Sequence, residues 1–139
     1  MTTTSYKKPL PFPTHLSKPF WDAARKHKLA LQKCSKCGTY QWYPKSWCIE
    51  CGSKDLKWTE ASGRGTIYSY TIIYHTKANP AFTEGAPFSI AAVELDEGPR
   101  MYGNILGCPP GELKIGMRVE VWFDDVTDKI SLPKFKLST

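Results

Sequence analysis

The chain has 139 residues, of which 41% are hydrophobic and 23% are charged, as suits one domain or two very small ones. No apolar run approaches the roughly 18–20 residues that span a membrane, and the N-terminus lacks the apolar stretch of a signal peptide, so we expect a cytoplasmic protein with no membrane partner. Residues 1–60 hold eleven Lys/Arg against four Asp/Glu, whereas residues 61–139 hold eight against nine. An anionic partner would therefore prefer the first half, unless the charge serves solubility alone.

Residues 1–17 are expected to form an extended arm, because they are rich in proline and threonine and show no hydrophobic periodicity. Residues 17–31 predict a helix in which Ser17 suits the N-cap and Pro19 the first turn. Its apolar face can pack on the rest of the chain or dock on a partner. The residues of that face, three to four positions apart, are Phe20, Trp21, Ala24, Lys28 and Leu31.

Residues 33–58 contain two copies of a Cys-x-x-Cys-Gly motif, which supply Cys34 and Cys37 from the first copy and Cys48 and Cys51 from the second. A glycine after each pair allows a left-handed backbone, and the intervening residues allow a short hairpin over residues 39–47. Four thiolates without an open position are typical of a structural zinc site. A redox dithiol needs only one pair, but rubredoxin-type iron uses the same four sulfurs, so the sequence leaves zinc and iron open.

The region around these cysteines is rich in aromatic and basic residues, and so many rings need neighbours outside the metal site. Basic residues interleaved with rings can bind single-stranded nucleic acid or a nucleotide-bearing cofactor, and they can equally form a solvated basic face. The rings are Tyr40, Trp42, Tyr43, Trp47 and Trp58, and the cations are Lys33, Lys36, Lys45, Lys54 and Lys57.

Residues 61–139 show strand patterns and no helical pattern. Five strands of this size best match an OB-fold barrel. The fold class is therefore mainly β, with an arm over 1–17, a helix plus rubredoxin-like zinc ribbon over 18–60, and a five-stranded OB-fold barrel over 61–139. The expected strands cover residues 65–76, 88–95, 100–106, 117–123 and 130–137.

The sequence contains no recognisable catalytic constellation. His15, His27 and His75 lie in different segments, and Cys108 lies in a rigid Gly-Cys-Pro-Pro-Gly turn without a base or an oxyanion hole nearby in sequence. The acidic residues around Asp124 are expected to form a solvated turn. We therefore expect a binding or accessory module that is not catalytic on its own.

Several segments in order carry a resemblance to a known family. This order resembles the zinc-ribbon/OB-fold family first catalogued as a domain of unknown function, the thirty-fifth in its series, over residues 18–137. The segments are Pro19-Phe20-Trp21, residues 31–38, Tyr43-Pro44, residues 48–51, Trp58, residues 62–70, residues 116–121 and residues 132–135.

The resemblance implies a non-catalytic accessory subunit in a hetero-oligomer with a thiolase-like enzyme, or with a hydratase of the hot-dog type, acting on acyl-CoA thioesters. The partner would hold the catalytic Cys and His, and the proline-rich arm is similar to arms in the aromatic-degradation thiolase branch. The family's metal ligands carry over to the four paired cysteines, with coenzyme A bound together with the partner. From charge and placement, Lys36, Lys45 and Arg64 are candidates for the phosphates of coenzyme A.

Two other functions remain open from the sequence. A nucleic-acid-binding zinc-ribbon/OB module is one, although the barrel half has one more acid than it has cations, whereas a nucleic-acid groove should be basic. A stand-alone enzyme that uses Cys108 or His75 is the other.

Overall fold

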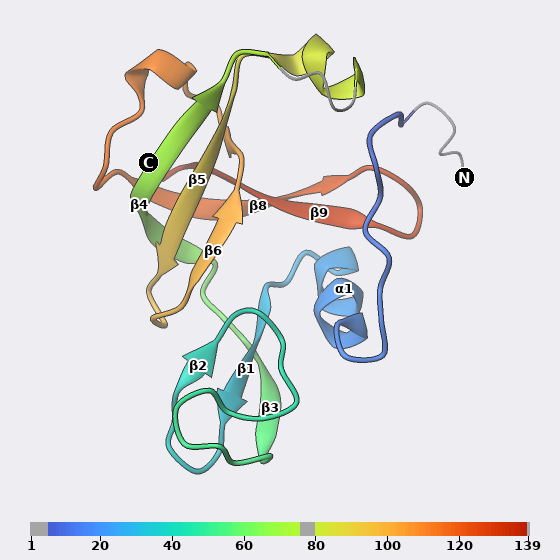
Figure 1. Ribbon diagram of the computed structural model, residues 1–139, viewed down its shortest axis with the longest axis vertical. Coiled ribbons are helices and arrows are strands. Elements are labelled where there is room, and N and C mark those ends of the chain that lie inside the picture. Colours follow the sequence, from blue (N-terminus) through green and yellow to red (C-terminus); the bar gives the residue numbers. More distant parts are fainter. Residues whose placement is uncertain (1–5, 76–79, 139) are drawn as a thin grey trace.

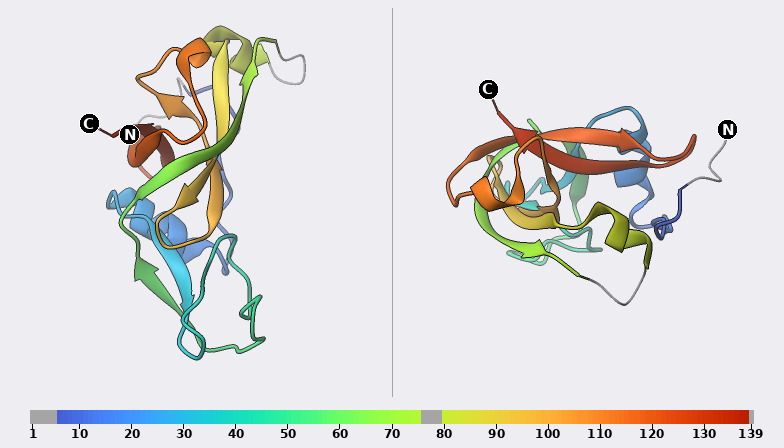
Figure 2. Two further views of the ribbon diagram at one scale, coloured as in Figure 1. Left: turned by 90° about the vertical axis from the view of Figure 1, so that its left-hand side faces the viewer. Right: turned by 90° about the horizontal axis from the view of Figure 1, so that it is seen from above.

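The computed structural model describes residues 6–75 and 80–138. Two β-sheets and one α-helix make up the regular structure, with two short 3-10 turns, η1 (Pro80–Gly85) and η2 (Pro110–Glu112), so the prediction of a mainly β chain is confirmed. The smaller sheet and the larger one lie end to end along the long axis of the molecule (Figures 1 and 2). The helix α1 (Lys18–Arg25) contacts β1 of the smaller sheet and β8 and β9 of the larger one.

Helix α1 is shorter than the sequence predicted, because it ends at Arg25 rather than near residue 31. His27 takes a left-handed conformation with φ 60°, which turns the chain into strand β1 (Ala30–Cys34). Ser17 occupies the N-cap but makes no capping bond, since its Oγ accepts from the backbone N–H of Thr14 instead. No helix in the described ranges is long and apolar enough to cross a membrane.

The smaller sheet has the strand order β2-β1-β3, with β2 at Tyr40–Gln41 and β3 at Leu56–Glu60. Both neighbours run antiparallel to β1, and Gln32 at its centre faces Gln41 on one side and Trp58 on the other. Leu31 is fully buried in β1, so its apolar character serves a strand and not a helix face.

The larger sheet has the strand order β6-β5-β4-β8-β9-β7. The predicted strand over residues 100–106 is divided at Asn104 into β6 (Arg100–Gly103) and β7 (Ile105–Leu106), which accounts for six strands where five were expected. β6 pairs antiparallel with β5, whereas β7 pairs parallel with β9, so one bent segment joins the two ends of the sheet into a barrel. The other strands are β4 (Arg64–Ile73), β5 (Phe88–Leu95), β8 (Arg118–Asp125) and β9 (Ser131–Leu137).

Asn104 is held at this bend by the buried Ser89. Its Nδ2 donates to the Ser89 carbonyl at 2.7 Å, and the N–H of Ile105 donates to Ser89 Oγ at 3.1 Å. The ring of Phe135 lies so close to Gly103 that a Cβ there would stand 2.8 Å from it. The bend therefore depends on a residue without a side chain at position 103.

The ribbon and the barrel are joined by only three residues, 61–63. The N–H of Ala61 donates to the carbonyl of Leu29 at 2.7 Å, and the N–H of Val121 donates to the carbonyl of Gly63 at 2.7 Å. Gly63 has φ 78°, and a Cβ there would lie 2.6 Å from Val121 Cγ1. The connection is thus bonded to both parts, and one apolar core runs from α1 through β1 into the barrel.

Candidate metal centre and neighbouring surfaces

The four paired cysteines come together at the end of the ribbon sheet. Their Sγ atoms all lie within 4.8 Å of one another, and the Cys34–Cys51 and Cys37–Cys48 pairs are each 3.6 Å apart. Thiolates bound at about 2.3 Å to a tetrahedral zinc ion stand about 3.8 Å apart, so the spacing fits zinc. The four-cysteine zinc ribbon expected from the sequence is confirmed as a fold.

Each cysteine pair is shaped by the turn that follows it. Gly38 donates its N–H to the Cys34 carbonyl at 2.8 Å, and Gly52 does the same to Cys48 at 2.9 Å. Both glycines have positive φ, 79° and 78°, as the sequence predicted. A backbone N–H group also donates to sulfur: the N–H of Cys37 lies 3.4 Å from Cys34 Sγ. Such contacts spread thiolate charge.

The four thiols differ in acidity. The Thr39 hydroxyl, 3.2 Å from Cys37 Sγ, lowers the pKa of Cys37 to about 6, and the N–H of Cys37 lowers the pKa of Cys34. The hydrogen bond from the Ser53 N–H acts to lower the pKa of Cys51. Burial and the three neighbouring thiols outweigh it and raise the pKa of Cys51 to about 11. Four thiolates cannot share this volume without a cation, so the donor set suits a divalent metal.

Two buried amides, which the sequence analysis missed, hold the loop that carries Cys48. Gln32 Oε1 accepts from Gln41 Nε2 at 2.8 Å and from the N–H of Lys45 at 2.9 Å. Gln41 Oε1 accepts from the N–H of Ile49 at 3.0 Å. Both side chains are buried. The only sequence signal was a glutamine directly after an apolar or aromatic residue in each of two neighbouring strands.

The three candidates for coenzyme A phosphates come from two different parts of the fold. Lys36 lies in the turn between β1 and β2, Lys45 in the loop between β2 and β3, and Arg64 at the start of β4. All three are exposed, but Lys36 and Lys45 belong to the ribbon and Arg64 to the barrel. The structure thus leaves them in separate parts of the fold and does not gather them around one of the cavities described below.

An aromatic groove of about 400 Å³ lies between the arm, α1 and the ribbon loop. Phe20 in α1 contacts Trp42 of the loop with ring centroids 4.4 Å apart, so this ribbon ring has a neighbour outside the metal site, as the sequence analysis expected. Phe12 and Tyr43 on the groove remain 89% and 64% exposed. The groove is lined by Pro11, Phe12, Thr14, Leu16, Ser17, Phe20, Trp21, Trp42, Tyr43 and Pro44.

Asp125 is exposed to solvent, as the sequence analysis expected, but it ends strand β8 and does not lie in a turn. Its carboxylate binds His27 Nε2 at 2.9 Å and also accepts a short hydrogen bond from Ser131. The His27 ring stacks on Phe123 with centroids 5.5 Å apart. A hydrolytic triad needs the histidine between the serine and the acid, whereas here the acid lies in the middle. The three residues therefore fasten the helix to the barrel.

This cluster gives a pH-dependent stability. The hydrogen bonds from Ser131 and then from His27 hold the pKa of Asp125 below its ordinary 3.8, so the ionised carboxylate favours the folded state. Its contribution is present above the ordinary pKa and is lost as pH falls through the lower folded-state value. We expect Asp125→Asn to lower the Tm near neutral pH and to flatten the fall of Tm below about pH 4, as measured by thermal unfolding at several pH values. Equal acid slopes for both proteins would contradict this.

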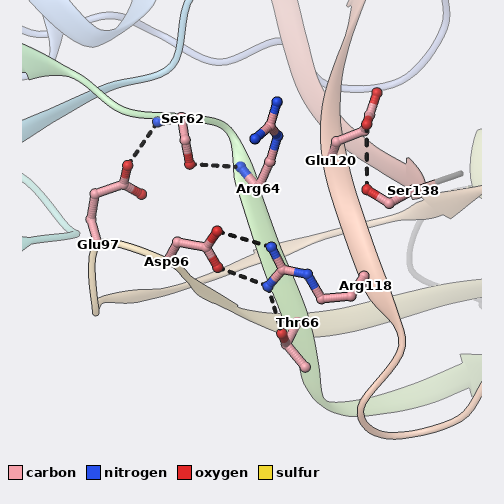
Figure 3. Close-up of polar contacts among 8 residues, drawn as sticks. All are labelled: Ser62, Arg64, Thr66, Asp96, Glu97, Arg118, Glu120 and Ser138. Atoms are coloured by element: carbon pink, nitrogen blue, oxygen red, sulfur yellow. Dashed lines mark hydrogen bonds and ion pairs between the residues drawn. The ribbon is translucent and has the colours of Figure 1, made fainter.

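A second charged cluster fastens the outer face of the barrel (Figure 3). Arg118 on β8 makes two bonds to Asp96, of 2.8 and 2.9 Å, and a third to the Thr66 hydroxyl at 3.0 Å. Hydrogen bonding from Arg118 keeps the pKa of Asp96 below its ordinary value. The Arg64 guanidinium, in contrast, forms no hydrogen bond or ion pair with any residue that the structure describes.

Two family models cover most of the chain. The one described as the ChsH2 rubredoxin-like zinc ribbon domain matches residues 21–57, and the one described as the ChsH2 C-terminal OB-fold domain matches residues 58–124. A chain in the solved structure of the Ltp2-ChsH2(DUF35) aldolase superimposes with a TM-score of 0.83 and 33% identity, over 94% of this chain and 100% of that one.

Curated relatives agree with these matches. The chain is 37% identical to a probable enoyl-CoA hydratase alpha subunit of Thermomonospora curvata over 84% of its own residues, and it spans about a third of that protein, 36%. It is 34% identical to a DUF35 domain-containing scaffold protein of Methanothermobacter thermautotrophicus, over 76% of this chain and 78% of that one. Benzoylsuccinyl-CoA thiolase subunit BbsA of Thauera aromatica is 26% identical over 69% of this chain and 63% of that one. The chain therefore belongs to the DUF35 family, which the sequence resembled, and carries its ChsH2-type zinc ribbon and OB-fold in the same order.

Proposed function

We propose that this chain is a non-catalytic accessory subunit that docks on a thiolase- or aldolase-type enzyme acting on acyl-CoA thioesters. The observation that carries the proposal is the aromatic groove, in which Phe12 and Tyr43 are largely exposed beside two tryptophans. Aromatic side chains in such a setting are typical of the anchors of protein interfaces. The names of the relatives, a hydratase subunit, a scaffold protein and a thiolase subunit, support a role in a complex.

The arrangement of polar side chains agrees with a subunit that leaves the chemistry to its partner. His27 is engaged with Asp125, and the Cys108 thiol lies 3.5 Å from the Pro109 carbonyl. In the part of the chain that the structure describes, no histidine lies within hydrogen-bond distance of a cysteine or serine. A bound zinc ion would hold the ribbon in shape and thereby keep Trp42 and Tyr43 in place for docking.

The proposal includes contacts to coenzyme A. Lys36, Lys45 and Arg64 are proposed to reach its phosphates, from two sides of the ribbon–barrel junction. Since these side chains come from separate parts of the fold, the partner enzyme would supply the rest of the site. Thiolytic cleavage of a carbon–carbon bond, or the formation of one, would take place in the active site of the partner.

The direct test is purification of the tagged chain from its native host with mass spectrometry of what accompanies it. We expect a stoichiometric thiolase- or aldolase-type enzyme. Tyr43→Asp is expected to reduce its recovery at least tenfold, since a tyrosine anchor contributes about 2 kcal/mol or more. The exposed Ile115, in the turn before β8, provides the control, and Ile115→Asp should retain the partner.

The same preparation tests the coenzyme A contacts. Changing Lys36, Lys45 and Arg64 together to Ala is expected to weaken coenzyme A binding by the complex while leaving the complex assembled. Unchanged affinity would remove these three residues from the proposal. Nucleic acid in place of an enzyme partner, or no companion at all, would contradict the proposed function itself.

A further inference from the structure

The outer face of the barrel carries a second aromatic cluster, on strands β4, β5 and β6. It surrounds a depression of about 250 Å³. Tyr68 and Tyr102 are 48% and 77% exposed there, so neither ring is needed to fill the core. The depression is lined by Tyr68, Ser69, Ala92, Arg100, Met101 and Tyr102.

A β-bulge creates this arrangement. The register of β4 on β5 shifts between Ile67 and Ser69, so that Tyr68 and Ser69 are both exposed although they are neighbours in a strand. Bulges redirect side chains and are frequent beside binding sites. Ala92 lies opposite Ser69 on one side and Tyr102 on the other. Two small side chains therefore lie between larger flat ones.

The flat groups are already arranged for stacking. The Arg100 guanidinium lies 3.6 Å from the centre of the Tyr68 ring, and two of its nitrogens, Nε and Nη2, each donate to Glu94 Oε2 at 3.3 Å. A guanidinium placed over a ring and an exposed tyrosine across a floor of Ser69 and Ala92 are surfaces on which a base can stack. A hydrocarbon chain would suit this depression less well, because hydroxyl and guanidinium groups line it.

We infer that this depression binds the purine ring of a small nucleotide, by stacking on Tyr102 and on the Arg100–Tyr68 pair. A polynucleotide is a poorer occupant, because the nearby cations Arg100 and Arg118 are already paired with Glu94 and Asp96 and leave little free positive charge for a continuous phosphate backbone. The stacking site stands on its geometry alone and does not require the proposed complex.

One cation, Arg64, is available to bind the phosphates of such a nucleotide. Arg64, Thr66 and Tyr68 alternate along the outer face of β4, which places Arg64 about 13 Å from Tyr68 along the strand. Arg118 is occupied by Asp96 and Thr66, whereas the Arg64 guanidinium makes no hydrogen bond or ion pair with a described residue, although its charge acts on the Asp96 carboxylate (Figure 3). The assignment of the ring to the adenine of coenzyme A, with Arg64 at its phosphates, rests on the proposed function.

The test is a titration of the full chain with AMP, in which binding is measured from the chemical shifts of the backbone amides in NMR spectra. We expect saturable shifts at Ser69, Ala92 and Tyr102 with a roughly millimolar dissociation constant. Tyr102→Ala is expected to weaken binding about fivefold or more, and Tyr102→Phe to retain it. Tyr74→Ala, which removes an exposed tyrosine beyond the end of β4, is the matched control.

Further ligands separate the sources of the purine. Coenzyme A binding more tightly than AMP, with the difference lost in Arg64→Ala, would support the inference and assign the ligand. Equal shifts with ribose 5-phosphate, or equal losses in Tyr74→Ala and Tyr102→Ala, would overturn it. Much tighter, strongly salt-dependent binding of oligo(dA) would overturn it in favour of a nucleic acid. Since the chain is tested alone, loss of the partner through Tyr43→Asp has no influence on these outcomes.

Discussion

Removal of the metal from the four cysteines is expected to unfold the ribbon, and Cys48→Ser is expected to do so without a chelator. The ribbon sheet has strands of only five, two and five residues, so its own hydrogen bonds offer little independent stability. In comparable sites the apparent binding free energy of zinc is about 10–16 kcal/mol and is also folding free energy. Cys48 is buried, and its loss leaves three thiols around an incomplete tetrahedron.

Metal content by mass spectrometry, far-UV circular dichroism and the NMR dispersion of ribbon amides are the measurements. We expect one zinc ion per chain, and a colourless protein distinguishes zinc from rubredoxin-type iron. Cys108→Ser is the control, because Cys108 lies in a turn of the barrel outside the four-sulfur cluster. A chelator that strips the metal without changing the circular dichroism or partner binding would refute the structural role.

Phe135→Ala is expected to reduce the free energy of unfolding by about 3–5 kcal/mol. The Phe135 ring is fully buried in β9, and the residue lies opposite Ile105 of β7 and Val121 of β8, at the place where the barrel closes. Truncation would leave a cavity beside Gly103, whose Cα faces the ring. The lost packing would therefore weaken the parallel contact between β7 and β9, which contains only two residue pairs.

Urea unfolding monitored by circular dichroism gives this free energy. Phe135→Leu, which keeps most of the volume, is the control and should cost less than half as much as Phe135→Ala. Adding Ala at Gly103 to the Phe135→Ala protein should be tolerated better than Gly103→Ala alone, because the ring that the new Cβ would strike is gone. A loss below about 1 kcal/mol for Phe135→Ala would mean that Phe135 does not support closure.

Features encoded by local patterns could be predicted from the sequence. The two Cys-x-x-Cys-Gly motifs identified the ribbon, since four sulfurs at this spacing have few other uses. The strand pattern over residues 117–123 predicted β8, in which Val119 and Phe123 are buried. These predictions succeeded because the pattern, the backbone geometry and the burial all arise from residues close in sequence.

Features that depend on distant contacts could not be predicted. The spacing of Leu31 suits a helix face and a strand equally well, and only burial in β1 decides between them. The division at Asn104 depends on Ser89, fifteen residues away, and the partners of Asp125 include His27, ninety-eight residues away. The depression beside Tyr68 and Tyr102 was missed for the same reason, because its rings come from strands whose register the sequence does not state.

The three-residue connection between ribbon and barrel has a thermodynamic consequence for any assembly. Because Ala61 is bonded to Leu29, just before β1, and Gly63 to Val121 of β8, the two parts do not have to be ordered relative to each other when a partner binds. A partner that touches the ribbon first therefore meets the barrel surface at a high effective concentration, and little conformational entropy is lost in the second contact. Preorganisation of this kind lets a chain of 139 residues present two separated surfaces as a single binding unit.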